Sequence, residues 1–312
     1  MKKILVTGAA GFIGSHLCEK LVERYEVLGI DNLSLGKLKN VESFLDNKNF
    51  QFFEIDILDR DMIEPTFQFY HYDTVFHLAA NSDISKGDPQ TDIDNTLKTT
   101  LVLLEQCRKH HIKEFVFASS SAIYGETEQL LTEDFGPLNP VSHYGAAKLA
   151  SEAFINSYCA NYGIKSWICR FPNVCGERST HGVILDFMEK IKKNPLQLDV
   201  LGDGNQIKPY IYVKELVEAM LFIWENADDM LNVYNIGVDT RTTVREIAEM
   251  VVKEMGRYII IKYEKKDRGW VGDVPQFNFS TKKLKTLGWS PLMTSNEAVE
   301  TSIRRMLDER QA

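Results

Sequence analysis

The first 31 residues constrain the fold of this 312-residue chain more than any other segment. Residues 3–8, KILVTG, form a short apolar run that ends at glycine, and residues 11–23 carry the apolar spacing of a helix. A second apolar run, residues 25–32 (YEVLGIDN), follows directly. A strand, a helix and a strand within this length predict a βαβ unit, whose two strands are parallel.

The same alternation continues through the first half of the chain. Helical patterns at 96–110 and 146–162 separate further apolar runs, which lie at 51–57, 74–80, 114–120 and 166–171. These runs are continuously apolar, as expected for parallel strands that helices cover on both faces. The pattern therefore predicts an α/β fold with a Rossmann-type, doubly wound parallel sheet.

The first turn has the composition of a phosphate-binding loop. Gly8, Gly11 and Gly14 lie between the first strand and the first helix, where glycines permit a tight turn and close approach of a pyrophosphate. The helix N-terminus adds free N–H groups and a positive dipole end. Asp31 ends the second strand, where a carboxylate binds the ribose hydroxyls and repels a 2′-phosphate. We expect tightly bound NAD rather than NADP.

The regular alternation loosens after Arg170. Two further strands are expected at 210–213 and 232–237, and helices at 244–255 and 295–308. We expect residues 1–172 to form an NAD-binding Rossmann domain, to which about 210–240 returns. Residues 173–209 and 241–312 are expected to form a smaller mixed α/β C-terminal lobe that binds the substrate.

The composition argues against several other classes of protein. A net charge of −8 disfavours a nucleic-acid-binding role, and no segment approaches the roughly 18 apolar residues that span a membrane. The five cysteines form no CxxC pair and have no histidine cluster nearby, so we expect reduced thiols, no metal site and a cytoplasmic location.

A second motif lies at 144–148, where Tyr144 and Lys148 share one helical face. An ammonium beside a tyrosine, together with a positive nicotinamide, favours tyrosinate and is expected to bring its pKa toward neutrality. Tyr144 would then accept a hydroxyl proton, while Lys148 would also hold the nicotinamide ribose. At the end of the run 114–120, a serine hydroxyl is expected to bridge Tyr144 and the substrate oxygen, and Ser120 and its neighbour Ser121 are the candidates.

Taken together, these motifs resemble the extended short-chain dehydrogenase/reductases, specifically the NAD-dependent sugar-nucleotide epimerase/dehydratase family. The resemblance extends over nearly the whole chain and includes TGAAGFIGSHL, VFHLAA, SSSAIYGE, YGAAK, RFPNVCGER and LGDGNQIKPYIYV. It implies bound NAD, a nucleoside-diphosphate sugar in the smaller lobe and oxidation of the sugar at C4. It also implies a homodimer, in which the helices at 96–110 and 146–162 pair with their mates in a four-helix bundle.

The resemblance also implies further site residues. The cofactor would contact, besides the residues above, Phe12, Ile13, Asn32, Ser34, Lys37, Asp56, Ile57, Leu78, Ala79, Ala80 and Pro172. The substrate would contact Ser82, Ser120, Asn173, Arg178, Lys208 and Arg268, and His181 is a further candidate for the sugar pocket. Two departures from the family pattern bear on substrate geometry: Thr96 stands where Asn is usual, and Pro209 where Asp is usual.

Several reactions are compatible with these residues. A C4 epimerase, which returns the hydride to the other face of a 4-keto sugar, is the first interpretation. A C4 dehydrogenase that releases the 4-keto product, for example from a GDP-linked hexose or heptose, is the alternative, with NADH reoxidised by a second substrate. A 4,6-dehydratase is disfavoured, because Ser121-Ala122 replaces the Asp-Glu pair that follows the catalytic hydroxyl residue in that subgroup. A non-catalytic NAD-binding scaffold is the least favoured.

Overall fold

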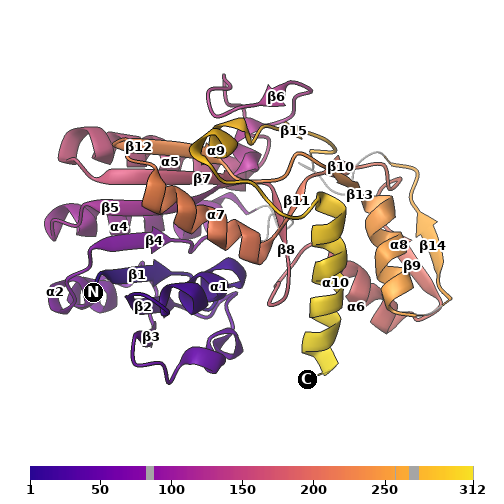
Figure 1. Ribbon diagram of the computed structural model, residues 1–312, viewed down its shortest axis with the longest axis horizontal. Helices are drawn as coiled ribbons and strands as arrows, with labels where there is room; N and C mark the ends of the chain where they lie inside the picture. The colour runs from indigo at the N-terminus through magenta and orange to yellow at the C-terminus, as the bar shows by residue number, and fades with distance from the viewer. Residues whose placement is uncertain (82–87, 257, 267–273, 312) are drawn as a thin grey trace.

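The computed structural model describes residues 1–81, 88–256, 258–266 and 274–311. Its centre is a seven-stranded parallel sheet with the strand order β12-β7-β5-β4-β1-β2-β3 (Figure 1). The strands are β1 (Lys3–Thr7), β2 (Glu26–Asp31), β3 (Phe50–Glu54), β4 (Thr74–His77), β5 (Glu114–Ser120), β7 (Lys165–Phe171) and β12 (Leu231–Asn235). The predicted parallel sheet is confirmed.

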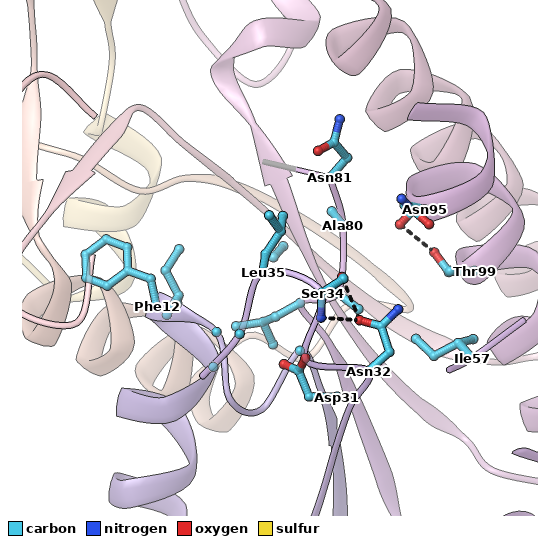
Figure 2. A pocket seen from close by; sticks show the side chains of 18 of the residues that line it. Phe12, Asp31, Asn32, Ser34, Leu35, Ile57, Ala80, Asn81, Asn95 and Thr99 are labelled. Carbon is cyan, nitrogen blue, oxygen red and sulfur yellow. Dashed lines mark hydrogen bonds between the residues drawn. The ribbon is translucent and has the colours of Figure 1, made fainter. Parts of the chain in front are cut away.

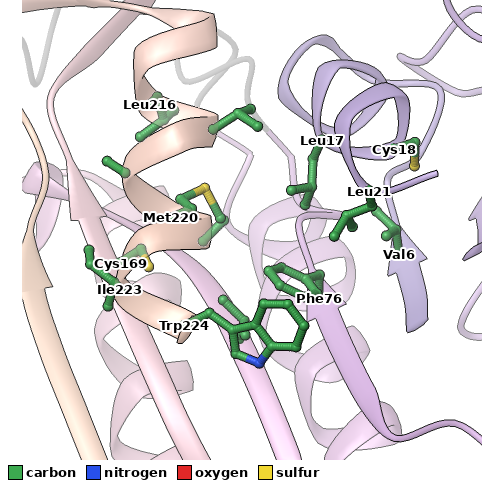
Figure 3. Packing of buried hydrophobic residues seen from close by; sticks show 14 of the residues in the cluster. Val6, Leu17, Cys18, Leu21, Phe76, Cys169, Leu216, Met220, Ile223 and Trp224 are labelled. Carbon is green, nitrogen blue, oxygen red and sulfur yellow. The ribbon is translucent and has the colours of Figure 1, made fainter. Parts of the chain in front are cut away.

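Helices cover both faces of this sheet, because successive residues of each strand point to opposite sides. Ile4 and Val6 of β1 pack in one core with α1 (Phe12–Leu21) and α7 (Val213–Asn226). Figure 3 shows Leu17 and Leu21 of α1 facing Phe76, with Trp224 of α7 beside it.

Leu5, between Ile4 and Val6, belongs to the core on the other face. That core includes α2 (Arg60–Phe69), α4 (Thr99–Lys109) and α5 (His143–Tyr162). Before α4 the chain forms α3 (Pro89–Asp92) and a π-helical turn, η4 (Ile93–Lys98). The short 3₁₀ segments are η1 (Leu38–Asn40), η2 (Glu42–Phe44) and η5 (Ser121–Tyr124).

The C-terminal part forms a second core beside the sheet (Figure 1). It contains α6 (Val183–Lys193), α8 (Val244–Glu254) and α10 (Ser295–Gln311), with β9 (Gln197–Val200) paired to β14 (Ile260–Tyr263). A capping box of Thr243 and Glu246 starts α8. Phe12, the first residue of α1, packs into this second core and so joins the phosphate-loop helix to it.

Three short strand pairs and one further helix complete the fold. The pairs are β8 (Asn173–Cys175) with β11 (Tyr210–Tyr212), β10 (Ile207–Lys208) with β13 (Thr242–Thr243), and β6 (Leu130–Leu131) with β15 (Asn278–Phe279); α9 spans Lys282–Leu287. Of the two late strands expected from sequence, β12 joins the central sheet and β11 lies outside it. The domain boundaries at 172, 209 and 241 stay a prediction. Within the described ranges, no helix is long and apolar enough to cross a membrane.

Candidate active site

A cavity of about 440 Å³ lies where β1, β2, β4 and β5 end (Figure 2). Ligands in open α/β sheets bind at the carboxyl ends of the strands, and this volume falls in the roughly 300–1,000 Å³ range of small-molecule sites. The sequence-predicted residues that line the cavity are Gly8, Gly11, Phe12, Ile13, Gly14, Asp31, Asn32, Ser34, Asp56, Ile57, Leu78, Ala79, Ala80, Tyr144 and Lys148.

The glycine turn leaves no room for side chains. Gly8 has φ +71, and a Cβ on it would lie 2.8 Å from the amide nitrogen of Ala79. A Cβ on Gly14 would lie 1.9 Å from the carbonyl oxygen of Gly8. Gly11, the N-cap of α1, provides no side-chain hydrogen bond to the first turn. The first-turn N–H groups therefore have no side-chain cap, and since Phe12, Ile13 and Gly14 line the cavity, they are available to phosphate oxygens.

Asp31 is held rigidly at the end of β2. Its Oδ2 accepts a hydrogen bond from the amide of Ala10 (3.0 Å), and its Oδ1 accepts one from Leu33 (2.8 Å). Burial raises the pKa of the carboxyl, while these backbone hydrogen bonds oppose the shift. Each carboxylate oxygen retains a further lone pair, so the group can still accept two ribose hydroxyls.

Asn32 extends this polar edge of the cavity. Its Nδ2 donates to Asp56 (3.0 Å), and its Oδ1 accepts from the Ser34 hydroxyl (2.7 Å). The glycine cradle, the open N-terminus of α1 and the fixed carboxylate of Asp31 together fit a dinucleotide with free ribose hydroxyls.

Tyr144 and Lys148, in the first turns of α5, line the same cavity. Ser142 starts this helix by accepting a hydrogen bond from the Gly145 amide (3.0 Å). Lys148 is only 2 % exposed, and its Nζ donates to the carbonyl of Ala118 (2.6 Å) and lies 5.7 Å from the centroid of the Tyr144 ring. The predicted pair is therefore assembled beside the end of β5.

The expected lowering of the Tyr144 pKa requires a bound, positively charged nicotinamide as well as Lys148, and it stays a prediction. Burial raises the pKa of Tyr144 to about 12, although a hydrogen bond with Ser120 opposes the rise. Burial likewise lowers the pKa of Lys148 to about 7. Desolvation therefore dominates both groups and favours their neutral forms.

The serines at the end of β5 have separate roles. Besides its bond with Tyr144, Ser120 accepts a hydrogen bond from the Ala122 amide (3.1 Å) and so starts η5. Ser121 is the first residue of η5 and does not line the cavity. Ser119 is fully buried, and its hydroxyl donates to Glu152 (2.5 Å), a contact that sequence reasoning missed.

Other predicted residues lie outside the cavity lining, namely Lys37, Ser120, Ser121, Pro172, Asn173, Arg178 and Lys208. Asn173 is in β8 and Lys208 in β10. Arg178 forms an ion pair with Glu19 of α1 (2.8 Å), and its amide donates to Glu309 of α10 (3.0 Å). Ser82 and Arg268 lie outside the described residues.

Cavity residues not predicted from sequence are mainly apolar strand ends and residues of the segment before α4. They are Ile30, Leu35, Gly36, Ile55, Asn81, Asp88, Thr91, Asn95, Thr99, Ala118, Phe171 and Thr180. His181, which the sequence did suggest for the sugar pocket, also lines the cavity.

The departure noted at Thr96 has a structural counterpart in η4. This π-helical turn places Asn95 in the cavity wall (Figure 2), while Thr96 is fully buried. A π-helical turn holds one more residue than an α-helical turn, and this shifts which side chains face one way. An Asn is therefore present at the cavity, one position earlier than the family pattern suggests.

Comparison with known proteins agrees with this geometry. Residues 4–237 match the sequence model of the NAD dependent epimerase/dehydratase family. A putative UDP-glucose 4-epimerase of Methanocaldococcus jannaschii is 36% identical over 97% of this chain and 98% of its own length. Some relatives are dTDP-D-glucose 4,6-dehydratases.

Solved structures share the whole fold. The crystal structure of a UDP-galactose 4-epimerase has a TM-score of 0.88 and 37% identity, and covers 98% of this chain and 99% of its own. UDP-glucuronic acid 4-epimerase from Bacillus cereus, in complex with UDP-glucuronic acid and NAD, has a TM-score of 0.87 and 31% identity. It covers 98% of this chain and 99% of its own.

Proposed function

The chain belongs to the NAD-dependent epimerase/dehydratase family, and from this premise we propose that it inverts C4 of a UDP-linked sugar through a 4-keto intermediate. It is an NAD-dependent enzyme of the nucleotide-sugar epimerase class. The observation that carries the proposal is that Tyr144 and Lys148 line the same cavity as the glycine turn and Asp31, with Ser120 hydrogen-bonded to Tyr144.

In the proposed reaction, Tyr144 takes the proton of the C4 hydroxyl and later returns it to the C4 oxygen. Ser120 shares a hydrogen bond with Tyr144 and orients the substrate oxygen. NAD, when bound, supplies the hydride acceptor and places a positive charge in the same enclosed space. The Lys148 ammonium favours the tyrosinate form and thereby opposes the effect of burial on the Tyr144 pKa.

Substrate contacts in the second lobe are also proposals. Asn173 has the strongest support, because its Nδ2 is buried without a hydrogen-bond partner among the described residues. A phosphate oxygen of the sugar nucleotide would satisfy this donor. Lys208 and Arg178, with Arg268 and Ser82 outside the described residues, are proposed to complete the site.

The neighbouring reactions have weaker support. A dehydratase needs an additional acid and base, and Ser121 and Ala122 follow Ser120 where that subgroup has carboxylates. A C4 dehydrogenase would use the same Tyr144 and Lys148, so the two reactions differ in whether the hydride returns.

The test is to incubate the purified enzyme with UDP-, GDP-, CDP- and dTDP-sugars, without added NAD, while following NADH absorbance and product NMR. We expect inversion at C4 of a UDP-sugar with no lasting NADH signal. Stoichiometric NADH with a released 4-keto product would contradict the epimerase proposal and support the dehydrogenase.

A matched pair of variants tests the catalytic assignment. Tyr144→Phe should reduce turnover by at least roughly 100-fold, because it removes the proton-transferring hydroxyl. Tyr162→Phe, an exposed tyrosine at the other end of α5, should retain activity. Comparable turnover by both variants would refute the role of Tyr144.

We also propose a homodimer and a cytoplasmic location. The exposed aromatic residues Phe154 and Tyr162 on α5 support an interface. All five cysteines are free and buried, which is usual for proteins kept in a reducing compartment.

A further inference from the structure

Three consecutive residues of β5 bind three side chains of α5. The carbonyl of Ala118 accepts from Lys148 (2.6 Å), and the hydroxyl of Ser119 donates to Glu152 (2.5 Å). The next residue, Ser120, shares a hydrogen bond with Tyr144. Tyr144, Lys148 and Glu152 are each four residues apart, so they lie along one face of the helix. Glu152 therefore continues the catalytic face one turn further into the protein.

The carboxylate of Glu152 is fully engaged. Arg170 of β7 donates through Nε to both oxygens (3.1 and 3.2 Å) and through Nη2 to Oε2 (2.7 Å). Glu152 and Arg170 are each only 6% exposed, so solvent screens this ion pair little. The second guanidinium nitrogen of Arg170 donates to the Tyr124 hydroxyl (2.9 Å) and the Glu133 carbonyl (3.1 Å).

The Glu152–Arg170 ion pair thus connects β5, β7 and α5 at one level along the strands. Arg170 of β7 lies opposite Ser119 of β5 in the sheet register, and Glu152 joins both to α5. This level is one residue before Ser120 and one helical turn beyond Lys148. A shift of α5 along β5 would break these bonds and would also separate Tyr144 from Ser120.

Glu152 also affects the pKa of Lys148 through its charge. Burial lowers the Lys148 pKa, and the negative charge of Glu152 opposes that shift. His77 of β4 is buried with its pKa well below the usual value, so it is neutral near pH 7. Asp92 of α3 acts on Tyr144 instead, because its negative charge raises the Tyr144 pKa.

We propose that Glu152 is a positioning residue of the active site, acting through Lys148 rather than on the substrate. Its carboxylate locks α5 against the ends of β5 and β7 and places the negative charge that retains the Lys148 ammonium. This inference rests on the proposed function, because it takes Tyr144 and Lys148 as the groups that handle the proton.

The test is an NMR titration of the lysine ε-carbon in NAD-free protein, in which the Lys148 signal is identified by its loss in Lys148→Met. We expect a wild-type midpoint of about 7. In Glu152→Gln the midpoint should fall by about one pH unit, a tenfold loss of proton affinity. Asp92→Asn, a matched change of a buried carboxylate to an amide, should leave the Lys148 midpoint unchanged.

A second variant covers the case in which Glu152→Gln fails to fold because Arg170 is left buried and unpaired. The double variant Glu152→Gln/Arg170→Gln removes both charges, and its Lys148 midpoint should fall by a smaller amount, because loss of the Arg170 cation partly offsets loss of the carboxylate. An unchanged or raised midpoint in either folded variant overturns the inference while leaving the proposed function intact. Activity of Tyr144→Phe would overturn the proposed function instead, so the two failures are distinguishable.

Discussion

Lys148, which we propose to serve the reaction, is a buried residue that destabilises the fold. Its amine is nearly inaccessible to solvent, and its pKa is lowered from 10.5 to about 7. Between these two pH values the unfolded chain holds a proton that the folded chain releases. The free energy of unfolding therefore rises with pH across this window. As the pH falls from 10.5 through 7, the cost of burying the Lys148 amine progressively lowers that free energy.

Replacing Lys148 by Met should remove this penalty. In NAD-free protein we expect Lys148→Met to be more stable than wild type by a few kcal/mol at or below neutral pH, and the difference should shrink toward pH 10. Urea unfolding of both proteins across this range measures the effect. The lost hydrogen bond to Ala118 is independent of pH, so a difference that does not change with pH would contradict the prediction.

At the scale of single elements, η4 determines which side chain of two neighbours reaches the cavity. Within this π-helical turn, Asn95 faces the cavity and Thr96 faces the interior. The buried Thr96 hydroxyl has no hydrogen-bond partner among the described residues. Such turns are frequent at functional sites because they re-aim side chains without ending the helix.

The two neighbours should therefore respond differently to substitution. Asn95→Ala should weaken binding of NAD or of the sugar nucleotide about fivefold, the effect of losing one ordinary hydrogen bond. Thr96→Val should leave both affinities unchanged and should raise stability by up to roughly 1 kcal/mol, because it removes an unsatisfied buried hydroxyl. Calorimetric titration and thermal unfolding check these expectations, and weaker ligand binding by Thr96→Val alone would refute them.

At the scale of the whole molecule, α5 has two functional faces. Tyr144, Lys148 and Glu152 lie along one face, and Phe154, two residues after Glu152, points away from that face. Phe154 is 42% exposed, and Tyr162, at the C-terminal end of the helix, is 47% exposed. In the proposed dimer, a second copy would cover Phe154.

Light scattering should therefore give twice the chain mass of 35.7 kDa. Phe154→Asp should shift the protein to monomer, because it introduces a charge into a desolvated interface. The control is Tyr258→Asp, which alters an aromatic residue that is 95% exposed just before β14 and should leave the dimer intact. A wild-type monomer at micromolar concentration would contradict the proposed assembly.

The features determined by sequence alone were those that depend on near neighbours along the chain. Gly8, Gly11 and Gly14 follow a strand and open a helix, and this local order predicts a phosphate loop. The strand and helix periodicities likewise predicted the parallel sheet, and the spacing of Tyr144 and Lys148 placed them on one helical face.

Only the tertiary structure decided the properties that depend on enclosure and on distant contacts. The direction of the Tyr144 pKa follows from burial by the whole fold, which outweighs the hydrogen bond with Ser120. The contact of Ser119 with Glu152 joins residues 33 positions apart, and β11 lies outside the sheet because it pairs with β8. Which side chains lose contact with water, and which strands pair, depends on the surfaces that meet in the folded protein. A local sequence pattern does not contain that information.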